Sequence, residues 1–338
     1  MRGRSLLVRA DADARIGSGH VMRCLAIAQA FQDAGGSVCW LSSALPAALE
    51  ARLEREGIEV LPRAAGAAAL ATACVAARAS WVVIDGYALG PEYASAGRGA
   101  GARALIVDDD GAAGQYPADI IVDPNVFASP AGYVNRPADA RLLCGPDYAL
   151  LRRELTAAGV AAPKRQSAER VLCTFGGADP AGLSALAIEA FGSLSQATEL
   201  RLLVGGANPR LTELQALARG RSRLAVVYDA SDMRAHLEWA DLAVTAAGGT
   251  CLELAFMGVP AIVAVTADNQ RRVAAAFVSR GAACALGEAG MITAPAIAAA
   301  VNALANDERA RAGMSRRGRE MVDGQGAARV VSAMLEVS

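Results

Sequence analysis

The chain contains 338 residues, more than one ordinary hydrophobic core uses and about the number that two domains need, since domains usually run ~100–200 residues. Its 33 Lys and Arg residues nearly balance its 34 Asp and Glu residues, so the formal net charge is −1 and argues against a surface built for nucleic acid or anionic lipid. Charged residues or glycines interrupt every apolar run before the ~18 residues that suggest a membrane-spanning helix.

Short β-branched runs alternate with longer Ala- and Leu-rich segments in the first half of the chain. Strands are predicted at 6–10, 37–41, 58–61, 81–85 and 104–108, with helices at 19–34, 46–56 and 64–79. Two further short runs, 120–122 and 142–144, extend the same set of strands. Apolar strands separated by helices are typical of a parallel sheet that is covered on both faces.

The second half repeats this alternation after a polar segment, 159–169, which contains Pro163 and is the predicted linker. Strands are expected near 171–175, 200–204, 224–228, 242–245 and 261–265, and helices near 181–192, 210–219, 232–239, 250–257 and 269–280. The stretch 295–335 is helical by composition. We therefore expect two doubly wound, Rossmann-like α/β domains facing a cleft, residues 1–160 and 169–320, with a C-terminal helix at 321–338 that packs on the first domain.

Seven cysteines and two histidines limit the metal and redox chemistry open to the chain. The cysteines are odd in number and scattered, with no Cys-x-x-Cys pair, so neither a disulfide framework nor a zinc knuckle is indicated. The N-terminal residues lack the features of a signal peptide. A reduced, cytoplasmic location is expected, and two histidines leave little material for a multi-histidine metal site.

A glycine-rich loop, Gly17-Ser-Gly19, joins the first predicted strand to the first predicted helix. Free backbone N–H groups at such a helix start can hold a phosphate near the carboxyl end of the strand. A dinucleotide-binding fingerprint would need Gly or Ala at position 22, where the chain has Met22, and an acid after the next strand, where it has Ser42 and Ser43. Binding of NAD is therefore disfavoured.

His20 begins the helix after this loop and is the first candidate for catalysis. At a helix start the ring can face the crevice while the helix dipole favours the neutral imidazole, which can act as a base. The alternative is a histidine that is only hydrogen-bonded there, and that structural role is assigned to His236. Asp11 and Asp13 flank the loop, where they either orient Arg9 or His20 or cap the turn.

A second informative loop, Gly248-Gly249-Thr250, again lies between a predicted strand and a predicted helix. Its helix start can hold a phosphate, with the Thr250 hydroxyl as an extra donor. Glu253, one turn into the helix, can accept hydrogen bonds from the two vicinal hydroxyls of a ribose. The same Thr-x-x-Glu spacing also fits a capping box, and on spacing alone the two interpretations are equal.

Motifs spread in order over residues 5–270 carry a resemblance to known families. The second half contains Asp-Met (232–233), Ala-Asp-Leu (240–242), Gly-Gly-Thr-x-x-Glu-Leu (248–254), Gly-Val-Pro-Ala (258–261) and Asp-Asn-Gln (268–270). It is similar through them to the glycosyltransferase-B superfamily and its peptidoglycan N-acetylglucosaminyltransferase, which uses a UDP-sugar. The first half contains Arg-Ala-Asp-Ala-Asp (9–13), Ile-Gly-Ser-Gly-His-Val-Met-Arg-Cys (16–24), Asp-Gly-Tyr (85–87), Asp-Asp (108–109), Gly-Pro-Asp-Tyr (145–148), Leu-Leu-Arg-Arg-Glu (150–154) and Phe-Gly-Gly-Ala-Asp-Pro (175–180). These motifs resemble the UDP-2,4-diacetamido-2,4,6-trideoxy-β-L-altropyranose hydrolases of pseudaminic acid biosynthesis.

The resemblance implies an inverting hydrolase that cleaves a UDP-linked diacetamido-trideoxyhexose at its anomeric C–O bond, with no metal or other cofactor. It implies that His20 is the catalytic base. Within the implied substrate site, Glu253 would hold the ribose, the Met233 backbone would read the uracil edge and Asn269 would reach the sugar or its phosphate. The substrate-binding residues are then Gly17, Gly19, Tyr87, Arg152, Met233, Gly248, Gly249, Thr250, Glu253 and Asn269.

Two other functions are compatible with the same motifs. A glycosyltransferase of this fold would pass the sugar to an acceptor in place of water. A nucleotide-sugar binding protein without catalysis would be unaffected by replacement of His20. Release of UDP over many turnovers without an acceptor distinguishes the hydrolase from both.

Overall fold

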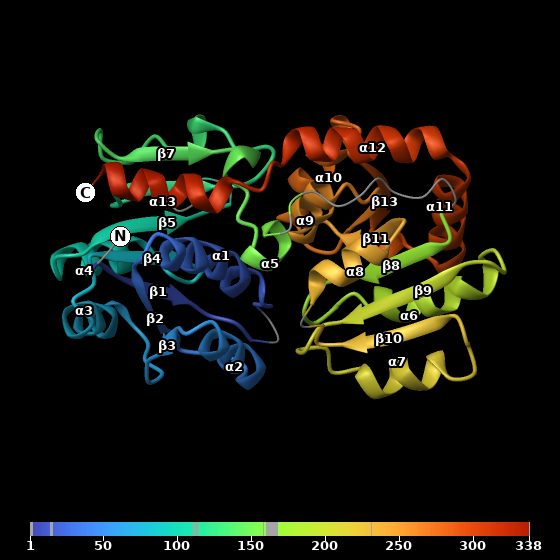
Figure 1. Ribbon diagram of the computed structural model, residues 1–338, viewed down its shortest axis with the longest axis horizontal. Coiled ribbons are helices and arrows are strands. Elements are labelled where there is room, and N and C mark those ends of the chain that lie inside the picture. The colour runs from blue at the N-terminus through green and yellow to red at the C-terminus, as the bar shows by residue number, and fades with distance from the viewer. Residues whose placement is uncertain are drawn as a thin grey trace. The chain divides into compact units, whose positions relative to one another are not determined.

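The chain forms two compact units, as the computed structural model in Figure 1 shows for residues 3–13, 16–109, 111, 114–157, 159, 168–230 and 232–337. The first unit comprises Met1–Arg153 with Gly324–Ser338, and the second comprises Glu154–Asp323. Most of the predicted linker at 159–169 lies outside the described residues. In the part of the chain described here, no helix is both long and apolar enough to cross a membrane.

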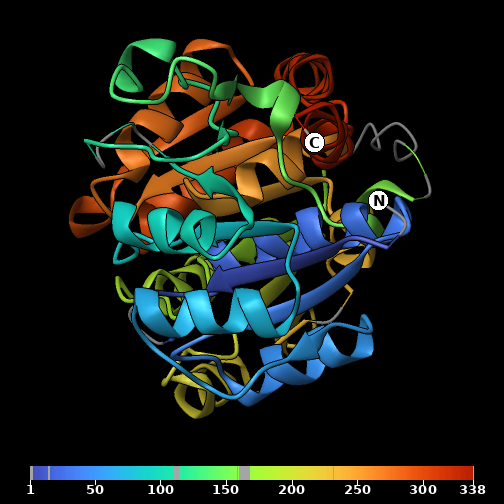
Figure 2. The same cartoon turned by 90° about the vertical axis from the view of Figure 1, so that its left-hand side faces the viewer.

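A seven-stranded parallel sheet, in the order β3-β2-β1-β4-β5-β6-β7, organises the first unit. Its strands are β1 (Ser5–Ala10), β2 (Ser37–Leu41), β3 (Glu59–Val60), β4 (Trp81–Asp85), β5 (Arg103–Val107), β6 (Ile120–Asp123) and β7 (Arg141–Cys144). The helices are α1 (Gly19–Asp33), α2 (Ala47–Arg55), α3 (Ala67–Ala76), α4 (Pro91–Gly99) and α13 (Gly326–Glu336). In Figure 2, which looks onto this unit, α3 and α4 lie in front of the sheet.

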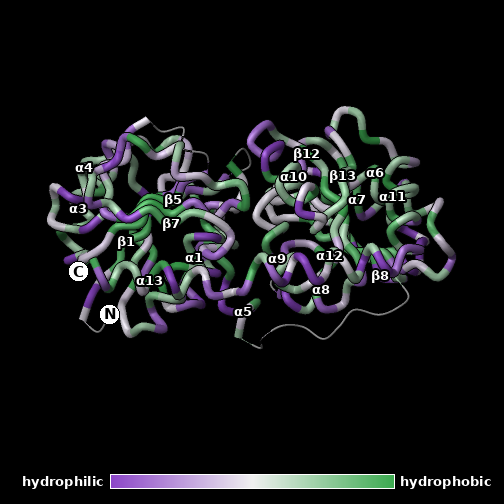
Figure 3. Tube along the Cα trace, turned by 90° about the horizontal axis from the view of Figure 1, so that it is seen from above, coloured by the Kyte–Doolittle hydropathy of each residue, from purple (hydrophilic) through white to green (hydrophobic). Residues whose placement is uncertain are grey.

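Both faces of this sheet are covered, which explains the uninterrupted apolar strands. Successive side chains of a strand point to opposite faces. Leu6 and Val8 of β1 therefore enter the core that includes α1 and α13, whereas Leu7 enters the core that includes α3 and α4. All three are fully buried, and Figure 3 shows the central strands as apolar tracts.

A six-stranded parallel sheet, in the order β10-β9-β8-β11-β12-β13, organises the second unit. Its strands are β8 (Arg170–Thr174), β9 (Glu199–Val204), β10 (Leu224–Tyr228), β11 (Leu242–Ala246), β12 (Ala261–Val265) and β13 (Ala283–Glu288). The helices are α5 (Arg153–Thr156), α6 (Leu183–Ala190), α7 (Leu211–Ala218), α8 (Met233–Trp239), α9 (Thr250–Met257), α10 (Gln270–Ser279), α11 (Ala294–Asn306) and α12 (Glu308–Met321). The crossovers on both sides of β8 confirm the predicted doubly wound α/β class.

Besides the short helix α5, three parts of the fold differ from the sequence prediction, each for a local reason. Helix α4 was not predicted because its segment, PEYASAGRG, is rich in small residues and has no clear apolar stripe. Strand β13 was not predicted because Gly287 interrupts its pattern. The stretch 295–335 contains three helices, because Asp307 caps α12 through Ala310 N at 2.8 Å and Gly324, with φ +80°, ends the run before α13.

Candidate functional site

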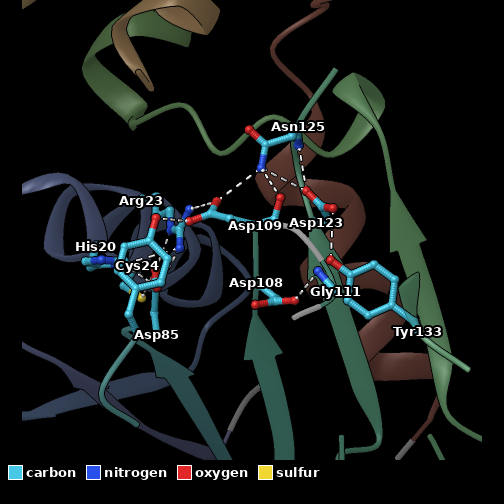
Figure 4. Close-up of polar contacts among 11 residues, drawn as sticks. His20, Arg23, Cys24, Asp85, Asp108, Asp109, Gly111, Asp123, Asn125 and Tyr133 are labelled. Carbon is cyan, nitrogen blue, oxygen red and sulfur yellow. Dashed lines mark hydrogen bonds and ion pairs between the residues drawn. The ribbon is translucent and has the colours of Figure 1, made fainter. Parts of the chain in front are cut away.

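Polar side chains gather where β1, β4, β5 and β6 of the first unit end. These strands are neighbours in the sheet and run parallel, so their carboxyl ends meet at one edge. The loop after β1 leads into α1 and His20, β4 ends at Asp85, β5 is followed by Asp109 and β6 ends at Asp123. Figure 4 shows these side chains pointing toward one another.

His20 is almost buried and is held by one carboxylate. Its Nδ1 lies 2.6 Å from Oδ1 of Asp85, and 7% of its side-chain surface remains exposed. Burial alone would raise the pKa of Asp85, but the Arg23 guanidinium and the His20 ring outweigh it and hold this pKa below its usual value. An ionised carboxylate only accepts hydrogen bonds, so Nδ1 carries the proton and donates it to Asp85. The second nitrogen, Nε2, is then the basic atom.

His20 and Asp85 belong to a closed ring of contacts that includes three further side chains. Arg23 donates from Nε to Oδ2 of Asp85 at 2.5 Å and from Nη1 to Oδ1 of Asp109 at 2.5 Å. The Tyr87 hydroxyl donates to Oδ2 of Asp109 at 2.6 Å. Its ring meets the His20 ring edge to face, with 4.8 Å between centroids. The ring of contacts therefore fixes both the direction of the imidazole and the aromatic surface beside it.

Tyr87 is the exposed member of this set. Its side chain is 66% exposed, although both its ring and its hydroxyl are engaged with buried or half-buried groups. Asp109 accepts from Arg23, Tyr87 and Asn125, and these partners hold the pKa of Asp109 well below its usual range although burial opposes the shift. A large aromatic surface held open to solvent beside a potential base can contact a substrate.

Asp123 forms a second buried polar group next to this ring. Its Oδ1 accepts from the side chain of Asn125 at 2.9 Å and its Oδ2 accepts from the Tyr133 hydroxyl at 2.9 Å. Asn125 also donates to Asp109 Oδ1 at 3.1 Å, so it links the two carboxylates. Burial raises the pKa of Asp123 to about 6, and the negative charge of Asp109 adds to this rise.

We expect Asp123→Asn to stabilise the protein at pH 8 but not at pH 4. A carboxyl whose folded pKa lies above its unfolded value contributes stability below the unfolded pKa, near 4, and loses it as the pH rises through about 6. The uncharged amide removes this penalty. Thermal unfolding should show a gain of about 1–3 kcal/mol at pH 8. An equal effect at both pH values would contradict the buried-charge explanation.

Asp11 and Asp13 have different roles in the loop after β1. Asp11 forms a two-point ion pair with Arg9, with N–O distances of 2.6 and 2.8 Å, and also accepts from Ser43 N at 2.7 Å. Asp13 caps the turn by accepting from the backbone N–H of Ile16 at 2.7 Å. Of the alternatives raised by the sequence, Asp11 orients Arg9 and Asp13 caps the turn. The carboxylate that orients His20 is instead Asp85.

The remaining first-unit candidates lie in loops or at the start of α1. Gly17, with φ +77°, occupies the left-handed region that suits glycine, and Gly19 is the first residue of α1. Arg152 is buried, 8% exposed, and lies between the 3-10 turn Pro146–Tyr148 and α5. A substrate contact for these residues stays a prediction.

Three residues of the network, Arg23, Asp85 and Asp109, were missing from the sequence-based candidates for the site. The sequence did contain an indication of the two acids. Asp85 ends an apolar strand and Asp109 follows one, and functional acids often lie at such carboxyl ends of parallel strands. Arg23 also lies one helical turn after His20, a spacing at which side chains meet. The strand order was needed to join these signals, because Arg23 and Asp109 are 86 residues apart.

In the second unit, the second glycine loop leads directly into α9. Gly249 is the N-cap residue with helical φ and ψ of −56° and −28°, and no side chain caps this end. Thr250 is therefore already inside the helix. A capping box would require Thr250 at the N-cap position, so that interpretation of the Thr-x-x-Glu spacing is wrong. The Gly248 N–H donates to the Ala246 carbonyl at 2.8 Å, and Glu253 is half-buried. Nucleotide contacts of Gly248, Gly249 and Glu253 stay a prediction.

The other second-unit candidates lie at two further helix starts on the same edge of the sheet. Met233 begins α8 after β10, where Asp232 caps the helix by accepting from Ala235 N at 3.0 Å. Asn269 is exposed and is the N-cap residue of α10, which follows β12. All of these positions lie at carboxyl ends of parallel strands, where ligands of this fold class bind.

His236, the second histidine, packs against cationic and aromatic side chains. Its Nδ1 lies 3.0 Å from Nη1 of Arg201, whose guanidinium stacks 4.0 Å from the centre of the Trp239 ring. Burial and the nearby Arg201 charge lower the pKa of His236. The Nδ1 atom of His236 is therefore engaged by Arg201, which is a structural contact.

Two parallel-sheet α/β units of this topology define the glycosyltransferase-B fold. Residues 171–327 match the Glycosyltransferase family 28 C-terminal domain. The chain is 23% identical over 235 residues to the spore coat polysaccharide biosynthesis protein SpsG of Bacillus subtilis (strain 168), which covers 69% of each chain.

Solved structures of the same fold resemble the whole chain. MurG of Acinetobacter baumannii is 17% identical, with a TM-score of 0.66 and coverage of 98% of this chain and 99% of that one. MnaA of S. aureus, solved with UDP, is 14% identical, with a TM-score of 0.68 and coverage of 99% and 98%. These likenesses establish the fold.

Proposed function

We propose that the protein hydrolyses a UDP-linked diacetamido-trideoxyhexose at the anomeric C–O bond and releases UDP and the free sugar in nonulosonic (pseudaminic) acid biosynthesis. The observation that carries this proposal is the Asp85–His20 pair, which leaves Nε2 basic on a nearly buried imidazole. The match of residues 171–327 to a glycosyltransferase domain supports a sugar-nucleotide substrate. The named relatives MnaA, solved with UDP, and SpsG, a polysaccharide biosynthesis protein, agree with this class.

In the proposed reaction the first unit supplies the base. Nε2 of His20 takes a proton from water as the water oxygen attacks the anomeric carbon. The C–O bond to the β-phosphate breaks, and its electron pair leaves with UDP. Asp85 stabilises the imidazolium that forms through the Nδ1–H hydrogen bond. A single displacement of this kind inverts the anomeric centre.

The second unit would hold the leaving nucleotide. Backbone N–H groups at the start of α9 and the Thr250 hydroxyl would bind the diphosphate, whose negative charge increases as the bond breaks. Glu253 would bind the ribose hydroxyls and the Met233 backbone the uracil edge. Asn269 would reach the sugar or its phosphate, while Tyr87 and Arg152 would line the site with Gly17 and Gly19.

A glycosyltransferase is the second candidate, favoured by the match to the family 28 C-terminal domain. Incubation of the purified protein with a panel of UDP-sugars, including diacetamido-trideoxyhexoses, and no acceptor separates the two. Release of UDP and free sugar over many turnovers supports hydrolysis. Release that needs an added sugar or lipid acceptor would establish transfer instead, and binding without release in the absence of an acceptor would exclude hydrolysis of the sugars tested.

We expect Glu253→Ala to weaken UDP binding while leaving the fold intact. Loss of hydrogen bonds to a charged group costs about 1–3 kcal/mol, or roughly 5- to 150-fold in affinity. Calorimetric titration with UDP measures this change directly. Glu213→Ala is the matched control, because Glu213 is an exposed glutamate in the first turn of α7 in the same unit. Unchanged affinity in the Glu253 variant would remove this residue from the site.

A further inference from the structure

Arg23 is placed unusually close to the carboxylate that orients His20. It lies one turn further along α1, and its Nε and Nη2 contact the two oxygens of Asp85 at 2.5 and 2.7 Å. Nη2 also lies 3.2 Å from Nδ1 of His20. The Asp85 side chain is fully buried, so bulk water does not screen its charge directly.

A buried carboxylate beside an imidazole would by itself favour the protonated ring. An imidazolium has no free lone pair and cannot take a proton from water. Arg23 opposes this effect in two ways. Its charge offsets that of Asp85, and its Nη2 stands next to Nδ1, where a second positive charge is disfavoured.

We propose that Arg23 is a positioning residue that neutralises Asp85 without displacing it, so that Asp85 directs the His20 ring while the imidazole stays neutral and basic. The contacts fit this role because Arg23 occupies both oxygens of Asp85 and still leaves Oδ1 as the acceptor of the Nδ1 proton. The inference rests on the proposed function in taking His20 as the base.

The other groups that face His20 set the sign of the expected effects. Asp109 pairs with Arg23 at 2.5 Å and reduces its influence, whereas the Tyr87 ring is uncharged and meets His20 edge to face. The Cys24 thiol lies 3.4 Å from Asp85, and burial raises the pKa of this thiol well above its ordinary value, so it stays neutral. Removal of Arg23 should therefore favour the imidazolium, and neutralisation of Asp109 should disfavour it.

The test follows the pH titration of the imidazole by NMR in the full-length protein. Only two histidines are present, so His236→Gln assigns both signals. Arg23→Met should move the titration midpoint of His20 upward by at least about one pH unit, the usual minimum for a charge within ~4–6 Å. Arg23→Lys should move it less, and Asp109→Asn should move it downward. Arg52→Gln, which breaks the Arg52–Glu56 pair on α2, is the matched control and should leave it unchanged.

Turnover gives a second readout. In Arg23→Met the acid limb of the kcat/KM profile should shift to higher pH together with the NMR midpoint. The loss of kcat/KM at pH 5.5 should therefore exceed the loss of kcat/KM at pH 8.5 by roughly tenfold. Equal loss at every pH with an unmoved NMR midpoint would overturn the proposal. If Arg23→Met does not fold, the opposite shifts of Arg23→Lys and Asp109→Asn decide it. The NMR titration needs no turnover. A wild-type protein that releases no UDP would therefore refute the proposed reaction, whereas the NMR midpoints of the variants would still decide the role of Arg23.

Discussion

Replacement of His20 by alanine should reduce turnover by ~10²–10⁴-fold while UDP affinity barely changes, because a positioned general base contributes about that factor. The proposed base belongs to the first unit, and the nucleotide contacts are proposed for the second, so chemistry and nucleotide binding should be separable. Steady-state UDP release and calorimetric UDP binding measure the two effects. His236→Ala is the matched control, since the second histidine packs against Arg201.

Reaction in oxygen-18 water tests the same role from the side of the products. Attack at the anomeric carbon places the label in the released sugar and none in UDP. Label in the β-phosphate would mean attack at phosphorus, and the role of His20 as the base for attack at carbon would have to be abandoned. Full activity of His20→Ala would contradict it equally.

Asp85→Asn should cause a loss of turnover comparable to that of His20→Ala, roughly 10²–10⁴-fold, with little change in UDP affinity. The amide can present an N–H to Nδ1, which then has to accept, so the proton moves to Nε2 and the basic atom is lost. The fold should persist because Arg23 retains Asp109 as an ionic partner. Circular dichroism and the kinetic assay check these two expectations together.

Asp33→Asn is the matched control for this variant, since Asp33 is a largely exposed carboxylate that pairs with Arg153 in the same unit. Retention of full activity by Asp85→Asn would show that the carboxylate neither selects the tautomer nor stabilises the imidazolium. The proposed reaction would then need another orienting group.

The strands were the most predictable part of the fold. The bounds of β2, β4, β10 and β12 coincide with the predicted 37–41, 81–85, 224–228 and 261–265. Strands β4 and β12 are buried on both faces and are short apolar runs between polar turns, whereas β10 lies at the end of its sheet and is recognised by its β-branched residues. Helix α4 and strand β13 lack such a pattern. Their positions depend on the sheet and helices around them, which local sequence does not describe.

For the site, sequence indicated which loops to examine but not which side chains meet there. His20 stood out because histidine is rare and follows a glycine loop, and Glu253 because of its spacing from Gly249. The carboxylate partner of His20, Asp85, ends a strand and lies 65 residues away in the chain, and Asp109, which pairs with Arg23, follows another strand and lies 86 residues beyond that arginine. Their meeting depends on the order β1-β4-β5, which emerges only when the whole sheet is assembled.

Helix α13 makes the two units nested in the chain rather than consecutive. The second unit, Glu154–Asp323, is an insertion between two parts of the first, and α13 returns Val330 and Met334, both fully buried, to the core that also contains Leu25 of α1. A cut near the middle of the sequence would therefore not yield two complete units. A fragment that ends at Arg153 would leave an apolar face of α1 open to water, and the missing piece could be supplied only by residues 324–338. Structural integrity of the half that carries His20 thus depends on residues that follow the second unit in the chain, so this half can be completed only after the entire second unit has been made.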